Sequence, residues 1–149
     1  MKSKIIKKYV DTISGFPVTL HNVKLVFFRG EWAAHIPYSF VDREIIRKLI
    51  KIKGRLTGAH IKFIRLHFHM TLQAFAQRLG VSHVAVMKWE RKKNKPSGMA
   101  WGIEKDIRLF MQSRMSKKAK DFYELFSDLE VPEKNEAQMV VIDTKKLAA

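Results

Sequence analysis

The stretch Thr71–Glu90 constrains the fold of this chain more than any other part of the sequence. Four apolar residues at its start are spaced to share one face of a helix: Leu72, Phe75, Ala76 and Leu79. Ala76 is small enough to let a second helix cross closely. Thr71 and Ser82 can each cap the start of a helix, and Gly80 can adopt the positive φ that a tight turn requires. The stretch therefore predicts two short helices joined by a tight turn.

The second of these helices, from His83 to about Arg91, has two distinct faces. Val86 and Trp89 lie three residues apart and are predicted to be buried against the body of the protein. The residues that must then point outward are His83, Val84, Met87, Lys88 and Arg91. An outward set of this kind is what a recognition helix offers to the major groove of DNA.

The same stretch resembles a known family. Residues 71–82 follow the pattern T-L-x-x-F-A-x-x-L-G-V-S, and residues 86–90 follow V-x-x-W-E. Both patterns are similar to the Xre/Cro-type helix-turn-helix of the lambdoid phage repressors. Upstream, Leu56–Arg65 resembles the L-T-G-x-E-I-R-F-L-R phrase of MqsA-like antitoxins. Together the resemblance covers roughly residues 55–112.

The chain departs from the MqsA-like pattern at three points. Those antitoxins carry an N-terminal zinc-binding domain built on cysteines, and this sequence has no cysteine, so that domain is absent or replaced. His60 stands where the family usually has Glu. Arg91-Lys92-Lys93 replaces the usual Asn-Gly-Lys, which adds cations, removes a glycine and predicts a different loop after the second helix.

The resemblance implies which residues contact DNA. Base contacts are expected from His83, Val84, Met87 and Lys88: the lysine would donate to guanine and the two apolar side chains would pack on thymine methyl groups. Phosphate contacts are expected at the starts of the two helices and in the cationic loop, namely at Thr71, Gln73, Ser82, Arg91, Lys92, Lys93 and Lys95. Read without the resemblance, Val84 and Met87 are scattered surface residues and the cationic run is an ordinary solvated loop.

The charge balance points to the same kind of partner. The chain has 29 Lys and Arg against 14 Asp and Glu, a net charge of +15. Acidic and basic residues nearly balance from Ser116 onward, so the excess lies before that residue. Such an excess favours a polyanion: nucleic acid, an acidic protein or an anionic membrane surface.

The rest of the chain predicts a mainly α fold with a small N-terminal β-hairpin and a five-helix core like that of lambda repressor. The predicted hairpin comprises Val18–Phe28 and Trp32–Tyr38, after a basic arm at residues 1–10 that we expect to be poorly ordered. A helix is predicted over Val41–Lys53, and the first core helix from Thr57 or Gly58 to His67. Three domains follow: residues 1–53, 54–115 and 116–149.

Two further helices and a strand complete the prediction. A helix over Met99–Met111 should bury Ala100, Ile103, Ile107 and Phe110. A helix over Lys117–Leu129 should bury Ala119, Phe122, Phe126 and Leu129. Residues 139–142 form a candidate short strand in the tail.

Several function classes find no support in the sequence. There is no thiolate metal site or disulfide, and His67 and His69 lie two residues apart, so on a helix they would not share a face to hold a metal. No phosphate-binding glycine loop or hydrolase motif is present, so we expect neither an enzyme nor a cofactor. No apolar run approaches the ~20 residues that span a bilayer. A cytoplasmic protein is expected, with anionic-membrane binding by the basic helix at Val41–Lys53 as a minor alternative.

Two functions remain open at this point. The first is a transcriptional repressor that binds double-stranded DNA as a homodimer, because one recognition helix reads few base pairs. The second is an antitoxin of a type II pair, which would bind a toxin protein through the N-terminal hairpin or the tail and repress its own operon.

Overall fold

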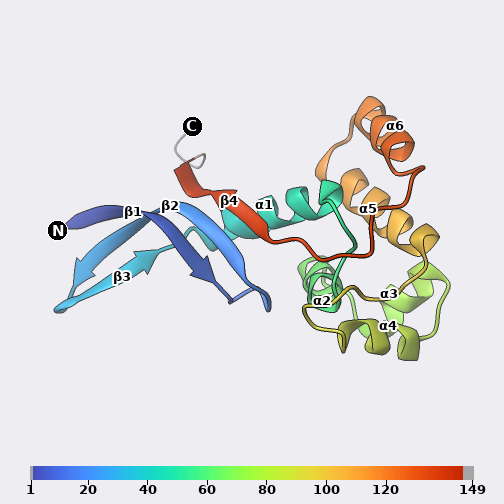
Figure 1. The fold of residues 1–149 in the computed structure, drawn as a ribbon, viewed down its shortest axis with the longest axis horizontal. Helices are drawn as coiled ribbons and strands as arrows, with labels where there is room; N and C mark the ends of the chain where they lie inside the picture. The colour runs from blue at the N-terminus through green and yellow to red at the C-terminus, as the bar shows by residue number, and fades with distance from the viewer. Residues whose placement is uncertain (1, 146–149) are drawn as a thin grey trace. The chain divides into compact units, whose positions relative to one another are not determined.

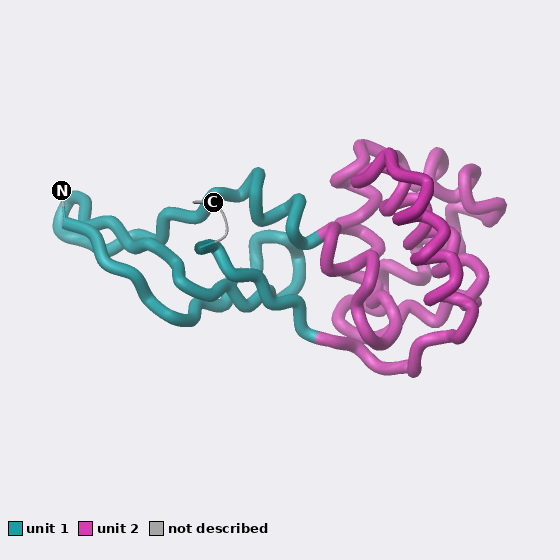
Figure 2. The backbone as a smooth tube through the Cα atoms, turned by 90° about the horizontal axis from the view of Figure 1, so that it is seen from above, with its two compact units in different colours: residues 1–45, 139–149 teal, residues 46–138 magenta. Residues whose placement is uncertain are grey.

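The computed structural model describes residues 2–145, which form four strands and six helices (Figure 1). The chain divides into two compact units, one formed by residues 1–45 with 139–149 and the other by residues 46–138 (Figure 2). The boundary falls within α1 (Tyr38–Lys51), so this helix contributes residues to both units. The C-terminal segment after residue 138 thus belongs with the N-terminal part of the chain.

The first unit is built on one sheet with β2 (Val18–Phe28) at its centre. Along one edge, β1 (Ser3–Asp11) pairs antiparallel with β2, from Ser3 opposite Val26 to Asp11 opposite Val18. The other edge is shared. β3 (Glu31–His35) pairs antiparallel with the second half of β2, and β4 (Val140–Asp143) pairs parallel with the first half.

The core of this unit lies at the first half of β2. Its buried apolar side chains include Phe16, Val18, Leu20, Val23, Val41, Ile45, Val140 and Ile142. Hydrogen bonds fix the neighbouring segments: the Tyr38 hydroxyl donates to the Asp11 carboxylate at 3.2 Å, and the Asn22 amide donates to the Asp143 carboxylate at 2.9 Å. The Thr144 hydroxyl donates to the carbonyls of His21 and Asn22, which holds the end of β4 against β2.

The second unit contains the end of α1 followed by five helices: α2 (Gly58–His67), α3 (Leu72–Leu79), α4 (His83–Glu90), α5 (Trp101–Met115) and α6 (Ala119–Asp128). Its buried residues include Ile46, Leu49, Leu56, Ile61, Ile64, Phe75, Val86, Ile107 and Met111. Burying a side chain of this size contributes about 1.5–3 kcal/mol relative to leaving it exposed.

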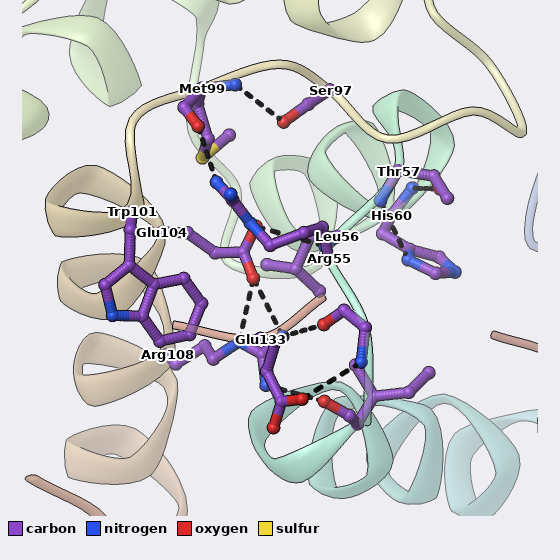
Figure 3. A network of polar contacts seen from close by, with 12 residues as sticks. Arg55, Leu56, Thr57, His60, Ser97, Met99, Trp101, Glu104, Arg108 and Glu133 are labelled. Carbon is purple, nitrogen blue, oxygen red and sulfur yellow. Dashed lines mark hydrogen bonds and ion pairs between the residues drawn. The ribbon is translucent and has the colours of Figure 1, made fainter. Parts of the chain in front are cut away.

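A buried ionic cluster joins α5 to the segment after α1 (Figure 3). Glu104 and Arg108 on α5 are both fully buried and form an ion pair of 2.8 Å. Arg108 also donates to the carbonyls of Ile52 and Gly54, at 2.8 and 2.7 Å. Glu104 in turn accepts from the backbone N–H of Leu56 and from the Arg55 side chain. Because every charge is matched by an opposite charge or a backbone dipole, the cluster can exist in the core.

The structure corrects the prediction in the N-terminal unit. The hairpin of β2 and β3 is confirmed, but it is only part of a four-stranded sheet. The expected poor order of the basic arm is wrong, since residues 3–11 form β1. Tyr38 begins α1 instead of ending a strand. The charged and largely exposed side chains of β1 hide the strand from a pattern search, because it is held by backbone pairing with β2.

In the second unit the five core helices are present, with different ends and some different buried residues. α5 begins at Trp101, so Ala100 precedes the helix and is exposed. In α6, Leu125 is buried, whereas Ala119 and Phe126 are exposed and Phe122 is half-buried. The Lys105 ammonium lies 3.9 Å from the centre of the Phe126 ring, so this ring contacts a cation instead of an apolar core. The predicted tail strand is confirmed as β4.

None of the helices among residues 2–145 is long and apolar enough to cross a membrane.

Candidate nucleic-acid interface

Three residues define the turn between α3 and α4: the two helix caps, Thr71 and Ser82, and Gly80. Thr71 caps α3 by accepting a hydrogen bond from the Ala74 N–H at 3.0 Å, and Ser82 caps α4 by accepting from Ala85 at 3.2 Å. Gly80 ends α3 with φ 71°, a conformation that costs a residue with a side chain about 1–2 kcal/mol. The N–H of Val81 then donates to the Ala76 carbonyl, which closes the turn. Both caps and the glycine turn are as predicted.

The inner face of α4 is held by burial and by one ion pair. Val86 is fully buried, Trp89 is nearly so, and both pack in the same unit as Phe75 and Ala76 of α3. At the end of α4, Glu90 forms a two-pronged ion pair with Arg65 of α2, at 2.8 and 3.1 Å. Paired bonds of this kind fix orientation as well as distance. They attach α4 to α2 in one geometry.

Sequence reasoning missed this ion pair. Arg65 also donates to the Met70 carbonyl at 3.0 Å, so it fastens the connection between α2 and α3 as well. The sequence did contain a sign of it. Glu90 is part of the V-x-x-W-E pattern of the family, but the pattern alone did not indicate which residue pairs with it.

The structure places the predicted base-contacting residues on the outer side of α4. His83, Val84 and Lys88 are exposed, and Val84 keeps 45% of its surface accessible although it is apolar. Met87 is half-buried, so only part of its side chain is available to a ligand. The four residues therefore lie together on one helix, with Val84 and Lys88 one turn apart.

The cationic loop after α4 is exposed in its side chains and fixed in its backbone. Arg91, Lys92, Lys93 and Lys95 are all exposed. The Lys93 carbonyl accepts from Ala59 at 2.8 Å and the Lys95 carbonyl from Gly58 at 3.2 Å, so the loop rests on the first turn of α2. Its four cationic side chains are thus carried by an ordered backbone beside α4.

Glycine at position 58 permits this close approach. A Cβ added there would lie 2.3 Å from the Trp89 carbonyl oxygen, closer than real contacts allow. The loop itself has no glycine, and Lys93 takes the left-handed conformation with φ 53°.

The start of α2 is fixed by an uncommon capping box. The Thr57 hydroxyl accepts from the His60 N–H, and the His60 Nδ1 accepts from the Thr57 N–H, both at 3.1 Å. Burial, together with the nearby Arg108 charge, lowers the pKa of His60 to about 4. A neutral imidazole therefore does here what a Glu side chain does in the usual box.

The remaining predicted phosphate contacts lie at the starts of the two helices. Thr71, Gln73 and Ser82 are all exposed, and the first-turn N–H groups of a helix carry a partial positive charge. Carboxylates are nearly absent around them, because Glu90 is the only acidic residue between positions 45 and 103 and it is paired with Arg65. The segment from α2 to the loop therefore carries no unpaired carboxylate, and its exposed cations, Lys88 and those of the loop, attract polyanions.

Of three comparisons with known proteins, one gives a match, and it falls on the segment described above. No curated protein and no solved structure matches the chain. Residues 61–100 match a family model described as helix-turn-helix, a span that runs from α2 through α3 and α4 to the residue before α5. Residues 61–100 therefore carry a helix-turn-helix of the kind found in DNA-binding transcriptional regulators.

Proposed function

We propose that this protein is a cytoplasmic repressor that binds a specific double-stranded DNA sequence as a homodimer, with α4 as the recognition helix. The observation that carries the proposal is the outer side of α4. It combines exposed His83, Val84 and Lys88 with an ordered cationic loop, and no unpaired carboxylate lies in the surrounding sequence. An exposed helix of this composition suits the major groove, where a phosphate backbone flanks donors, acceptors and methyl groups.

Each predicted residue has a distinct role in this proposal. Lys88 donates to guanine O6 or N7, and Val84 packs on a thymine methyl group, assisted by the exposed part of Met87. His83 contacts a base or a phosphate at the start of the helix. Phosphates are bound by the loop cations and by the first turns of α3 and α4, whose caps are Thr71 and Ser82.

The recognition role is tested by selecting binding sites from random duplex DNA with the wild-type protein. The Lys88→Ala and Val84→Ala variants are then measured on the selected site and on single-base variants of it. We expect each variant to lose about 1–3 kcal/mol of discrimination at one or two base pairs. Lys120→Ala, which removes an exposed lysine from α6, is the control and should keep both affinity and selectivity. Unchanged selectivity in both α4 variants would refute the assignment of the reading face.

Dimerisation is a separate part of the proposal. A dimer should select a site with two-fold symmetry whose half-sites are centred about 10 base pairs apart, or a multiple of that distance. Sedimentation of the protein on the selected duplex gives the stoichiometry directly. One chain on a site without symmetry would contradict the dimer and leave the reading face intact.

The antitoxin alternative remains a prediction. The described part of the first unit exposes lysines at positions 2, 4, 7 and 8, so a toxin bound by this unit would need an acidic surface. Co-expression with the product of an adjacent small gene tests it. Relief of that product's toxicity would support the alternative, and unrelieved toxicity would reject it.

A further inference from the structure

The end of the N-terminal sheet away from its buried core has no role in the DNA recognition proposed for α4. We call residues 2–8 and 24–35 the ribbon; they comprise most of β1, the second half of β2 and all of β3. The buried apolar residues of this unit all lie outside the ribbon, and Val23 borders it. Within the ribbon, by contrast, Ile5, Phe28 and Trp32 expose 62%, 58% and 41% of their surfaces. Of these three, Trp32 lies on the same face of the sheet as Phe27, whereas Ile5 and Phe28 lie on the opposite face.

The ribbon is also strongly cationic. Its basic residues are all exposed, and they are Lys2, Lys4, Lys7, Lys8, Lys24 and Arg29. Its only carboxylate is Glu31. A surface with this balance attracts anions and repels cations at any pH near neutrality.

The strand register gathers aromatic rings and lysines on one face of the ribbon. Lys4 is opposite Leu25, which is opposite Ala34, and in the next row on the same face Phe27 is opposite Trp32. The Phe27 and Trp32 ring centres lie 5.3 Å apart. The Lys4 ammonium lies 4.3 Å from the centre of the Trp32 ring, and the Lys2 ammonium lies 5.8 Å from that of Phe27.

We propose that this face of the ribbon binds single-stranded nucleic acid, with a base stacked on Trp32 and the adjacent phosphates held by Lys2 and Lys4. Aromatic side chains that stack bases, flanked by cations that follow the backbone, are the combination by which proteins hold single strands. An arriving base replaces the Lys4 ammonium over the Trp32 ring. The ammonium then lies within reach of the phosphate next to that base.

The position of the cations favours a nucleic acid over an acidic peptide strand added to β1. A peptide strand would form backbone hydrogen bonds with the outer edge of β1. Its affinity would not depend on Trp32, which lies on β3, two strands away across the sheet. Here the lysines lie over the rings on the face, where a stacked base and its phosphate need them. The site belongs to the first unit and α4 to the second, so the proposal does not depend on duplex recognition by that helix.

The experiment measures the anisotropy of fluorescently labelled dT12 and rU12 with the full-length protein at low salt. Three variants accompany the wild type: Trp32→Ala removes the ring, Trp32→Phe keeps a ring, and Tyr123→Ala removes another exposed aromatic residue, on α6. A fourth variant, Lys88→Ala with Arg91→Ala, weakens the duplex site. Circular dichroism confirms that each variant is folded.

We expect Trp32→Ala to weaken the binding of at least one oligonucleotide about ten-fold, while Trp32→Phe and Tyr123→Ala stay within about two-fold of the wild type. The variant with both Lys88→Ala and Arg91→Ala, called the α4 variant, should keep its affinity for single strands and lose its affinity for the selected duplex. Three results would overturn the proposal: no binding of either oligonucleotide by the wild type, equal binding by Trp32→Ala, or loss of single-strand binding in the α4 variant. Binding of the duplex is read separately, so failure of either site is distinguished from failure of the other.

Discussion

Two clusters of charge in the helical unit use the same residue types for opposite purposes. Around Glu104, two arginines are buried or nearly so, and they donate to a carboxylate and to backbone carbonyls. After α4, Arg91 and three lysines are exposed, and only their backbone is tied to the rest of the protein. A charge that is satisfied inside the protein fixes the fold, whereas a charge left in solvent beside α4 is available to a ligand.

The largest expected effect comes from breaking the buried cluster. Glu104→Gln removes the charge that pairs with both Arg55 and Arg108 and leaves two cations uncompensated. The free energy of unfolding should fall by about 3–5 kcal/mol, measured by urea denaturation. Glu124→Gln, at an exposed pair on α6, is the matched control and should change it by less than about 1 kcal/mol. Equal effects in the two variants would abolish the distinction between buried and exposed charges.

The next effect concerns pH and His60, whose pKa is lowered by burial and by the charge of Arg108. The folded-state pKa of about 4 is below the ordinary value of 6.5, so the unfolded state binds more protons between these values. Neutral His60 therefore makes its full contribution to the free energy of unfolding above pH 6.5. This contribution, about 3 kcal/mol in total, is lost as the pH falls toward 4.

Unfolding measured across this window in the wild type and in His60→Gln tests the assignment. Glutamine can keep the acceptor for the Thr57 N–H but does not titrate. The difference in free energy between the two proteins should change with pH below 6.5 and be flat above it. A difference that does not vary between pH 4 and 6.5 would mean that His60 is protonated as readily in the folded protein as in the unfolded one.

A smaller effect is expected from the exposed cluster, and it should appear in binding alone. Lys92→Ala removes one proposed phosphate contact. Affinity for duplex DNA should fall by a similar factor on every sequence, and the dependence of log K on log salt should become shallower by about one. The free energy of unfolding should stay within about 0.5 kcal/mol of the wild type. A changed base preference would show instead that the loop reads sequence.

The smallest effect separates the backbone of the loop from its charge. Lys93→Gly relieves a positive φ of 53° and should leave the unfolding free energy unchanged or raise it by up to about 1 kcal/mol, while DNA affinity falls. Lys92 does not have a positive φ, so Lys92→Gly should lower stability by about 0.5–1 kcal/mol with a similar loss of affinity. If both variants lose stability equally, the left-handed conformation at Lys93 carries no strain.

Local chemistry made the helix-turn-helix predictable. Thr71, Gly80 and Ser82 act within a few residues of their own positions, and helical spacing alone marked Val86 and Trp89 as buried. The same reasoning misassigned Phe126 in α6 and the strand at residues 3–11. Whether a moderately apolar face or a charged strand is covered depends on partners elsewhere in the chain.

The two short helices, their caps, their turn and the cationic character of the surface beside them follow from the order of the amino acids alone. Long-range contacts are evident only in the folded chain: β4 pairs with β2 across more than a hundred residues, Arg65 pairs with Glu90, and Glu104 pairs with Arg55 and Arg108. The physical reason is that caps and turns are satisfied by neighbours in the chain. Strand pairing and buried ion pairs are satisfied by residues that only the folded chain brings within hydrogen-bond distance.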